Sequence, residues 1–325
     1  MSVFYLPVVV YILYLCGRYR RLSFLSVNPG LPMSGLIGER KADSLSQLQD
    51  VPELARFAVL ELAGDLDARL GAIEKLMQTH GFDFPVVFKP DFGQRGQDVA
   101  VVRTPERMQD YLSHAEGRLI IQEYVGGLEF GVFYMRFPGP NEGRIYSITE
   151  KTFPVVTGDG LSTLEHLLMA NPRTHYMADF LLNLHADRLD WVLHDGEEFQ
   201  VVEIGSHCRG SVFLNGSQHI TPELTQVIDR VSRRIDGFNF GRYDVRVPNL
   251  ASLRNGRDLK VLEVNGVTSE STNIYDPGHS LVDAYRILLK QWRHAFEIGE
   301  QAIADGAKQV TLRQFVSHLK QTYFS

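Results

Sequence analysis

The chain has 325 residues, of which 44% are hydrophobic and 22% are charged, so it can bury a sizeable core and is expected to be globular rather than disordered. Its formal net charge is −6 and its basic residues are scattered, which excludes the broad basic surface of a nucleic-acid-binding protein. Cys16 and Cys208 form no CxxC pair, which argues against a disulfide framework or a structural zinc site. A cytoplasmic location is therefore expected.

The N-terminus carries an apolar run from Val3 to Cys16, followed by Arg18, Arg20 and Arg21. The run is shorter than the ~20 residues that a spanning helix needs. A secretory signal would carry its charges before the run rather than after it. Two interpretations remain: a buried first helix, which is favoured, or an interfacial anchor that associates residues 3–21 with the inner face of a membrane.

Helices and strands are expected to alternate through the first half of the chain. Apolar periodicity and turn residues predict strands at Ser23–Val27, Pro85–Lys89, Val99–Val102 and Leu119–Glu123. The spacing of Leu45, Leu48, Val51 and Leu54 suggests a helix, although Pro52 limits how far it can continue. Further helices are expected at Leu66–Thr79 and from about Thr104-Pro105.

The second half is expected to be richer in strands. They are predicted at Phe130–Phe137, Arg144–Lys151, Leu189–His194, Phe199–Ile204, Gly241–Val247 and Leu259–Val264, the third and fourth forming a hairpin. Helices are predicted from about Ser162, along Leu224 to Ile235, and at Leu281–Ile298 and Leu312–Tyr323.

The strongest chemical signal is Glu263-Val264-Asn265, which ends an apolar strand, together with Arg242-Tyr243-Asp244, which starts the preceding strand. If these strands are antiparallel neighbours, Glu263, Asn265 and Asp244 face one site, because side chains alternate along a strand. Such oxygen ligands suit Mg²⁺. The alternative is a surface hairpin with solvated charges, but an unpaired carboxylate within an apolar strand would be costly.

Two weaker motifs suggest a nucleotide. Lys89 ends a strand and precedes the loop from Asp91 to Gly96, where the ammonium and backbone N–H groups could hold phosphates. The strand Leu119–Glu123 leads into a hinge whose backbone could pair with adenine, and Glu129 beyond it could accept ribose hydroxyls. Taken alone, each motif could as well be an ordinary strand followed by a turn that binds no nucleotide. Walker A, kinase HRD and GxGxxG motifs are absent from the sequence.

The order of four motifs resembles the ATP-grasp superfamily of carboxylate–amine ligases. These motifs are Lys89 with its loop, the Glu123–Glu129 hinge, Arg242-x-Asp244 and Glu263-x-Asn265. The resemblance extends from about Lys41 to Pro277. D-alanine–D-alanine ligase is similar over the motifs of Lys89, Glu129 and Asn265. The segments Val156–Thr163 and Val201–Pro222 resemble cyanophycin synthetase.

The resemblance implies an α+β ATP-grasp fold in which two α/β lobes clasp ATP. It divides the chain into an apolar extension at 1–40, a first lobe at 41–125, and a second lobe at 126–325 that carries the metal and substrate site. It further implies Mg²⁺, with Mn²⁺ as an alternative, held by Asp244, Glu263 and Asn265. The implied nucleotide-binding residues are Lys41, Lys89, Gly93, Gly96, Glu123, Tyr124, Val125, Glu129 and Lys151.

Arg242 would stabilise the acyl phosphate and the tetrahedral intermediate. His207 and Cys208 are neighbours whose side chains would point to opposite faces of a strand, so a nucleophilic pair is disfavoured. Arg209 is a better functional candidate, because a guanidinium binds carboxylate or phosphate with two hydrogen bonds. The loop Gly266–Asp276 differs from the Pro-Gly loop of many ATP-grasp ligases and is expected to face the amine.

The implied function is an ADP-forming ligase that joins a small-molecule carboxylate to an amine, with amino acids or peptides as expected substrates. Two alternatives stay open: an ATP-grasp kinase that phosphorylates a small molecule, and a catalytically silent nucleotide-binding module at the membrane. Nucleic acid is not expected as a partner, and a homodimer is left open.

Overall fold

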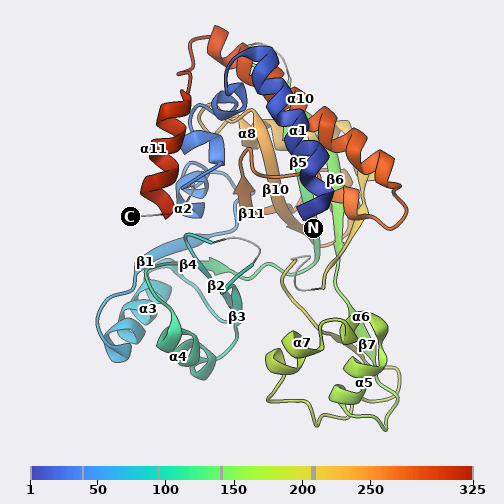
Figure 1. Cartoon of the computed structure of the whole chain (residues 1–325). Helices are drawn as coiled ribbons and strands as arrows, with labels where there is room; N and C mark the ends of the chain where they lie inside the picture. The colour runs from blue at the N-terminus through green and yellow to red at the C-terminus, as the bar shows by residue number, and fades with distance from the viewer. Residues whose placement is uncertain (1, 39, 94–95, 140–141, 206–209, 324–325) are drawn as a thin grey trace.

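The computed structural model describes residues 2–38, 40–93, 96–139, 142–205 and 210–323. Within these ranges, a four-stranded and a five-stranded antiparallel sheet form the centres of two lobes (Figure 1). Helices cover both sheets, so the predicted α+β class with two α/β lobes is confirmed.

The first lobe is built on the strand order β1-β4-β2-β3. Its strands are β1 (Phe57–Glu61), β2 (Val86–Pro90), β3 (Ala100–Val102) and β4 (Arg118–Glu123), and its helices are α3 (Leu66–His80) and α4 (Pro105–His114). Val86 and Phe88 pack against helix residues such as Ile73. Because side chains alternate along a strand, Lys89 and Gln122 lie on the opposite face of this sheet.

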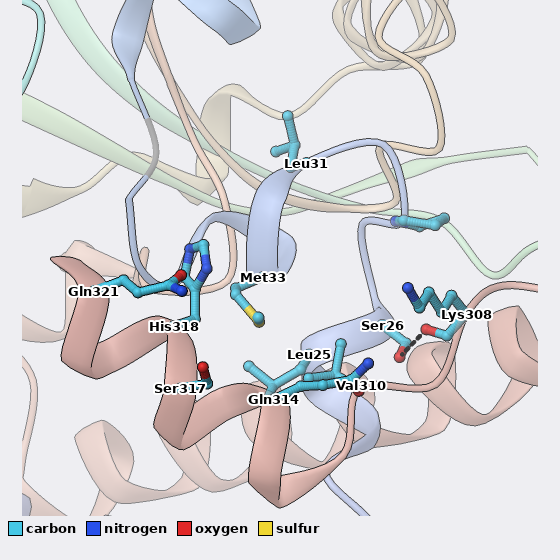
Figure 2. A pocket seen from close by; sticks show the side chains of 11 residues that line it. Leu25, Ser26, Leu31, Met33, Lys308, Val310, Gln314, Ser317, His318 and Gln321 are labelled. Carbon is cyan, nitrogen blue, oxygen red and sulfur yellow. Dashed lines mark hydrogen bonds between the residues drawn. The ribbon is translucent and has the colours of Figure 1, made fainter.

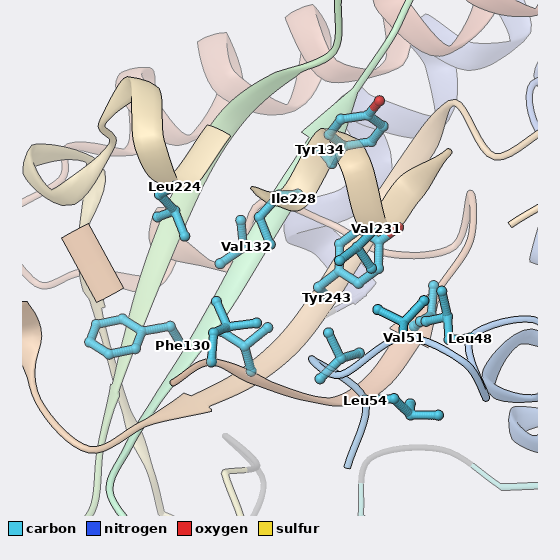
Figure 3. Packing of buried hydrophobic residues seen from close by; sticks show 14 of the residues in the cluster. Leu48, Val51, Leu54, Phe130, Val132, Tyr134, Leu224, Ile228, Val231 and Tyr243 are labelled. Carbon is cyan, nitrogen blue, oxygen red and sulfur yellow. The ribbon is translucent and has the colours of Figure 1, made fainter. Parts of the chain in front are cut away.

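The second lobe has the order β11-β10-β5-β6-β9. Its strands are β5 (Leu128–Met135), β6 (Arg144–Thr152), β9 (Val212–Asn215), β10 (Phe240–Val247) and β11 (Lys260–Asn265). On one face, Val132 and Tyr243 pack against Ile228 of α8 (Pro222–Ser232) in a hydrophobic core (Figure 3). Neighbouring residues of each strand therefore point to the other face, which carries the charges.

One end of that other face is also apolar. Phe133 and Phe240 of the sheet pack with Phe296 of α10 (Leu281–Ala304) and with the short 3-10 helix η1 (Ser23–Ser26). The helix α1 (Ser2–Tyr19) lies along α10 (Figure 1).

A smaller unit follows the strand β6. The strands β7 (Val155–Thr157) and β8 (Glu198–Gln200) pair with each other, and helices α5 (Leu164–Ala170) and α7 (Ala178–Leu184) pack on them. The short helix α6 (Pro172–His175) contacts α5 and α7. The predicted hairpin between Leu189–His194 and Phe199–Ile204 is therefore wrong. Long-range burial of Leu193 and Val201 against α5 prevails over the local turn signal.

The predicted strand Ser23–Val27 is also wrong, because Phe24 and Leu25 form η1 and bury themselves against α10. The α-helices and strands that were not predicted are β1, β7, β9, α6, α7 and α9 (Leu250–Arg254). The remaining elements are α2 (Lys41–Ser46), η2 (Pro32–Gly35), η4 (Ser217–His219), η5 (Thr272–Tyr275) and α11 (Leu312–Tyr323).

The chain enters the first lobe from the edge of the second. Leu45, Leu48 and Leu54 belong to the core beneath the five-stranded sheet, and the N–H of Ala55 donates to the carbonyl of Val261 in β11. Beyond this edge, the strand β1 begins. The division of the chain at residues 40 and 125 stays a prediction.

Helix α1 is apolar on both sides. Val8 and Leu15 are buried, whereas Val3, Leu6 and Leu13 are 84%, 61% and 65% exposed. One side of the helix packs on α10, as the buried-helix interpretation expects, and the other side faces outward. The interpretation as a membrane anchor stays a prediction. In the described part of the chain, every helix is too short or too polar to traverse a bilayer.

A buried amide joins the N-terminal segment to the second lobe. The side chain of Asn28 is fully buried and donates from Nδ2 to the carbonyl of Phe240 at 2.7 Å. Its Oδ1 accepts from the N–H groups of Asn239 and Phe240, each at 2.9 Å. One side chain thus satisfies backbone groups at the start of β10.

The substitution Asn28→Ala is expected to lower the free energy of unfolding by about 3 kcal/mol, because it leaves buried donors and an acceptor without partners. Urea denaturation followed by circular dichroism measures the change. The exposed Asn183→Ala in α7 serves as the control and should stay within about 0.5 kcal/mol of the unsubstituted protein. Equal stabilities of the two variants would contradict the bridging role of Asn28.

Candidate active site

A row of charged side chains crosses the five-stranded sheet on the face away from α8. Strand pairing places Lys151 opposite Glu129, and Glu129 opposite Arg246. Two residues further along β10, Asp244 lies opposite Glu263 of β11. The register therefore gathers residues from four strands into one charged cluster.

Glu129 is the centre of this cluster. Its Oε1 accepts from Lys151 Nζ at 2.8 Å, and its Oε2 accepts from Arg246 Nε at 3.0 Å. All three side chains are less than 10% exposed. A buried carboxylate between two cations is compensated in charge and fixed in orientation.

Asp244 continues the network toward Arg242. Its Oδ1 lies 3.2 Å from Lys151 Nζ and accepts from Arg242 Nε at 3.0 Å. Burial opposes ionisation of Asp244, but the charges of Arg242 and Lys151 outweigh it and lower the pKa of the carboxyl. Burial likewise opposes the charged form of Lys151, yet Asp244 and Glu129 raise the pKa of its ammonium. At neutral pH Asp244 and Lys151 are therefore both charged.

Lys89 reaches the same region from the first lobe. Its Nζ donates to Oε1 of Gln122 at 2.9 Å and to the carbonyl of Leu262 in β11 at 3.0 Å. Burial, supported by the neighbouring charge of Lys41, lowers the pKa of Lys89 to about 8, although Glu263 and Asp244 favour its charged form. Both hydrogen-bond acceptors of Lys89 are neutral. A negatively charged ligand placed here would therefore pair with its ammonium.

Lys41 and the glycine loop lie together. Lys41 Nζ donates to the carbonyl of Gly93 at 2.6 Å, and Asp91 Oδ1 accepts from the N–H of Ala42 at 2.8 Å. The backbone φ of Gly96 is 73°, a left-handed conformation that favours glycine. The start of α2 and the loop after β2 are thus held as one unit.

The predicted hinge follows β4. Glu123 accepts from the N–H and Nε of Arg56 at 2.9 and 2.8 Å. The ring of Tyr124 faces two guanidinium groups, those of Arg103 and Arg246, at 5.3 and 5.7 Å from its centroid. The carbonyl of Val125 accepts from Arg246 at 2.6 Å. The hinge is therefore fixed to the charged cluster through Arg246.

The predicted metal ligands do meet. Asp244 pairs with Glu263 and Arg242 pairs with Asn265, so the predicted antiparallel contact between these two strands is confirmed. Among the described residues, no three His, Cys, Asp or Glu side chains form a metal-binding group. Two carboxylates and one amide remain as the donor set.

This donor set fits a hard cation. Among the described contacts, the Glu263 carboxylate has no hydrogen bond, and the buried Nδ2 of Asn265 has no partner. The Asp244 carboxylate, in contrast, is already paired with Arg242 and Lys151. A Mg²⁺ ion takes few protein ligands beside substrate phosphates and water, so Glu263, Asn265 and a shared Asp244 suffice.

Arg246 was missed by the sequence reasoning. It contacts Glu129, Val125 and the carbonyl of Glu203, the last at 2.8 Å. The available signal was the alternation Arg242, Asp244, Arg246, which places the third residue on the same face as the first two.

The segment before residue 206 lies directly over the cluster. A Cβ atom on Gly205 would collide with Oε1 of Glu129 and with the Lys151 side chain, so only glycine allows this close approach. Arg103 of the first lobe forms an ion pair with Glu203. The candidate Arg209, with His207 and Cys208, lies outside the described residues.

A pocket of about 360 Å³ lies elsewhere, between the N-terminal segment and α11 (Figure 2). Leu25, Met33 and His318 line it, and none of its lining residues belongs to the charged cluster.

Replacing Arg246 tests the charged cluster. The substitution Arg246→Met is expected to cost about 3 kcal/mol of unfolding free energy, because it removes one cation from buried Glu129. Combining it with Glu129→Gln should cost less than the sum of the two single changes, by at least about 1 kcal/mol. Urea denaturation of the four proteins gives the coupling. Arg107→Met removes an exposed ion pair as the control, and strictly additive effects would contradict the coupling.

Comparison with known proteins finds similarity to two synthetases and a ligase. No protein-family model matches it. It is 23% identical over 204 residues to cyanophycin synthetase from Geminocystis herdmanii (strain PCC 6308), a match that covers 56% of this chain and 22% of that protein. The chain thus spans about a fifth of the length of that relative.

Two solved structures are also similar. D-alanine–D-alanine ligase from Bacillus anthracis shares 15% identity at a TM-score of 0.47, covering 85% of this chain and 72% of that one. A bifunctional glutathione synthetase from Pasteurella multocida shares 15% identity at a TM-score of 0.39, covering 77% of this chain and 36% of that one. The predicted resemblance to cyanophycin synthetase is thereby confirmed as a similarity in sequence.

Proposed function

We propose that the protein is an ATP-dependent ligase that forms an amide bond between a carboxylate and an amine through an acyl phosphate. The observation that carries this proposal is the meeting of both lobes at one charged site. Lys89 of the first lobe donates to the backbone of β11 beside Glu263, and Glu263 lies opposite Asp244. Cations for phosphates and oxygen ligands for Mg²⁺ thus stand next to each other.

The roles of the nucleotide-binding residues follow from their positions. We assign the ATP phosphates to Lys89, Lys41, Lys151 and the loop with Gly93 and Gly96. Adenine would lie against Glu123, Tyr124 and Val125, and ribose near Glu129. Mg²⁺, or Mn²⁺ in its place, would be held by Asp244, Glu263 and Asn265 and would neutralise phosphate charge.

Glu129 needs an adjustment to meet ribose. Both of its oxygens are engaged by Lys151 and Arg246, and Gly205 lies against it. A ribose hydroxyl can donate to a remaining lone pair of the carboxylate once the segment at Gly205 gives way. The ion pairs would hold the carboxylate in place during that exchange.

The proposed reaction proceeds in two steps. A carboxylate oxygen of the substrate attacks the γ-phosphorus of ATP, and ADP leaves. The amine nitrogen then attacks the acyl carbon, phosphate leaves, and the nitrogen gives up a proton. Arg242 is positioned to stabilise the negative charge of both stages, because its guanidinium is fixed by Asp244 beside the metal ligands.

A hydroxylamine assay separates this proposal from its two competitors. With ATP, Mg²⁺ and a panel of amino acids, peptides and small carboxylic acids, a ligase is expected to yield a hydroxamate and ADP. Lys89→Ala should lower the rate at least about 100-fold, since charge neutralisation is the main aid to phosphoryl transfer. Lys75→Ala, on an exposed face of α3, is the matched control and should keep the rate.

A stable phosphorylated product that resists hydroxylamine would instead support a kinase, and no turnover with retained ATP binding would support a silent module. Circular dichroism of Lys89→Ala verifies its fold. If the protein binds no ATP, and the variant is equally inert, the nucleotide site itself is refuted.

We further propose that α1 rests on an anionic lipid surface. Its outward face carries Leu6, Val10 and Leu13, which are 61%, 58% and 65% exposed, and Arg18 and Arg20 follow at its C-terminal end. An apolar face bordered by arginines matches the boundary between acyl chains and anionic headgroups.

Vesicle sedimentation tests the lipid contact. The protein should bind vesicles that contain phosphatidylglycerol more than those of phosphatidylcholine alone, and the triple change Leu6→Gln, Val10→Gln and Leu13→Gln should reduce binding at least about tenfold. The double change Leu161→Gln and Leu312→Gln, at exposed apolar residues elsewhere, is the control. A dimer that the triple variant turns into a monomer would show that a second copy covers α1 instead.

A further inference from the structure

We propose that Glu270, together with the hydroxyl groups of Tyr5 and Tyr275, binds the ammonium group of the amine substrate. This inference rests on the proposed ligase function and names the site of its second substrate. It also gives the N-terminal helix α1 a direct part in the active site.

The three groups form a triangle of oxygens. Tyr5 Oη donates to Glu270 at 3.0 Å from Oε1 and 2.9 Å from Oε2. Tyr275 Oη donates to Oε1 at 2.6 Å, and the two hydroxyl oxygens lie 2.5 Å apart. All three side chains are partly buried, so each keeps some contact with solvent.

The triangle is rich in acceptor oxygens. Four contacts join its oxygens, and each of the two tyrosine hydroxyls brings one proton to them. Burial and the Glu270 carboxylate raise the pKa of Tyr275, so this hydroxyl keeps its proton at neutral pH. The cluster therefore offers the carboxylate oxygens of Glu270 and two hydroxyl oxygens as hydrogen-bond acceptors.

A primary ammonium complements such a cluster. It carries three N–H donors and one positive charge, and hydrogen bonds between charged partners are stronger than neutral ones. An alkyl or carboxylate group offers the triangle no donor. The chemistry thus selects the amine, and not the carboxylate, as its ligand.

The triangle is connected to the proposed reaction centre. Nη1 of Arg242 donates to the backbone carbonyl of Glu270 at 3.5 Å. Glu270 is also one of the carboxylates that raise the pKa of the Arg242 guanidinium. The ring of Phe213 lies 6.4 Å from that of Tyr275 and 6.0 Å from Lys151 Nζ. An ammonium held at Glu270 would therefore stand beside the groups assigned to the acyl phosphate. It would give one proton to the Glu270 carboxylate, and the neutral nitrogen could then attack the acyl carbon.

The loop that carries Glu270 and Tyr275 is fixed from two sides. The N–H of Ser271 donates to Oε1 of Gln291 in α10 at 2.9 Å, and the hydroxyl of Thr272 donates to that of Thr149 in β6, also at 2.9 Å. Hydrogen bonds from two elements hold the loop at a defined place above the sheet.

Tyr5 reaches this loop because α1 is held on α10. The Phe4 ring stacks on that of Tyr285 at 5.3 Å, and the Tyr285 hydroxyl donates to the carbonyl of Phe4 at 2.9 Å. Tyr285 thus anchors the same turn of α1 without touching Glu270. It offers a matched control for a merely structural role of Tyr5.

Competition between two nucleophiles tests the inference. Hydroxylamine is largely uncharged at neutral pH, so it traps the acyl phosphate without needing a site for an ammonium group. Glycinamide carries an ammonium group and would use such a site. In the unsubstituted protein, glycinamide should lower the hydroxamate yield. The half-maximal glycinamide concentration is the one that halves the hydroxamate yield that each protein gives without glycinamide. In Glu270→Gln this concentration should rise at least about tenfold, as expected for the loss of charge-assisted hydrogen bonds.

Three further variants complete the experiment. Tyr5→Phe and Tyr275→Phe should each raise the half-maximal glycinamide concentration about threefold or more, and Tyr285→Phe should leave it unchanged. The inference is overturned if glycinamide does not compete, if Glu270→Gln leaves the half-maximal concentration unchanged, or if Tyr285→Phe shifts it as much as Tyr5→Phe. An unsubstituted protein that yields no hydroxamate refutes the ligase proposal itself, which is a different outcome.

Discussion

The ion pairs of Glu129 with Lys151 and Arg246 depend on one constraint, the register of the five-stranded sheet. Three side chains of alternate charge meet only because β6, β5 and β10 pair at these residues. A slip by one residue would turn the carboxylate toward the apolar core under α8, where it would lack a partner. Correct pairing therefore positions the site and protects the fold at the same time.

The two lobes meet where this register places β11 at the sheet edge. Lys89 and Gln122 of the first lobe both donate to the carbonyl of Leu262 in β11 of the second lobe. Burial lowers the pKa of Lys89 to about 8, so this side chain carries its proton only part of the time near that pH. An incoming phosphate would favour its charged form, so nucleotide binding and the protonation of Lys89 support each other.

Apolar packing at the other end of the sheet determines where the N-terminus lies. Helix α10 packs on Phe133 and Phe240, and α1 packs on α10. This arrangement brings Tyr5 to Glu270 across 265 positions of sequence. The same apolar helix thus presents a tyrosine to the polar site and an apolar face to its surroundings.

The sequence by itself determined the local patterns. The alternation in Arg242-x-Asp244 and Glu263-x-Asn265 predicted which side chains share a face, and the structure pairs these strands as expected. The lysine at the end of β2 and most helices were equally readable, because strand and helix periodicity depend on near neighbours. Tertiary structure alone decided the partners of these groups. Arg246 beside Glu129, Tyr5 beside Glu270, the 3-10 helix at Ser23 and the pairing of β7 with β8 all arise from burial between distant segments, which local periodicity does not encode.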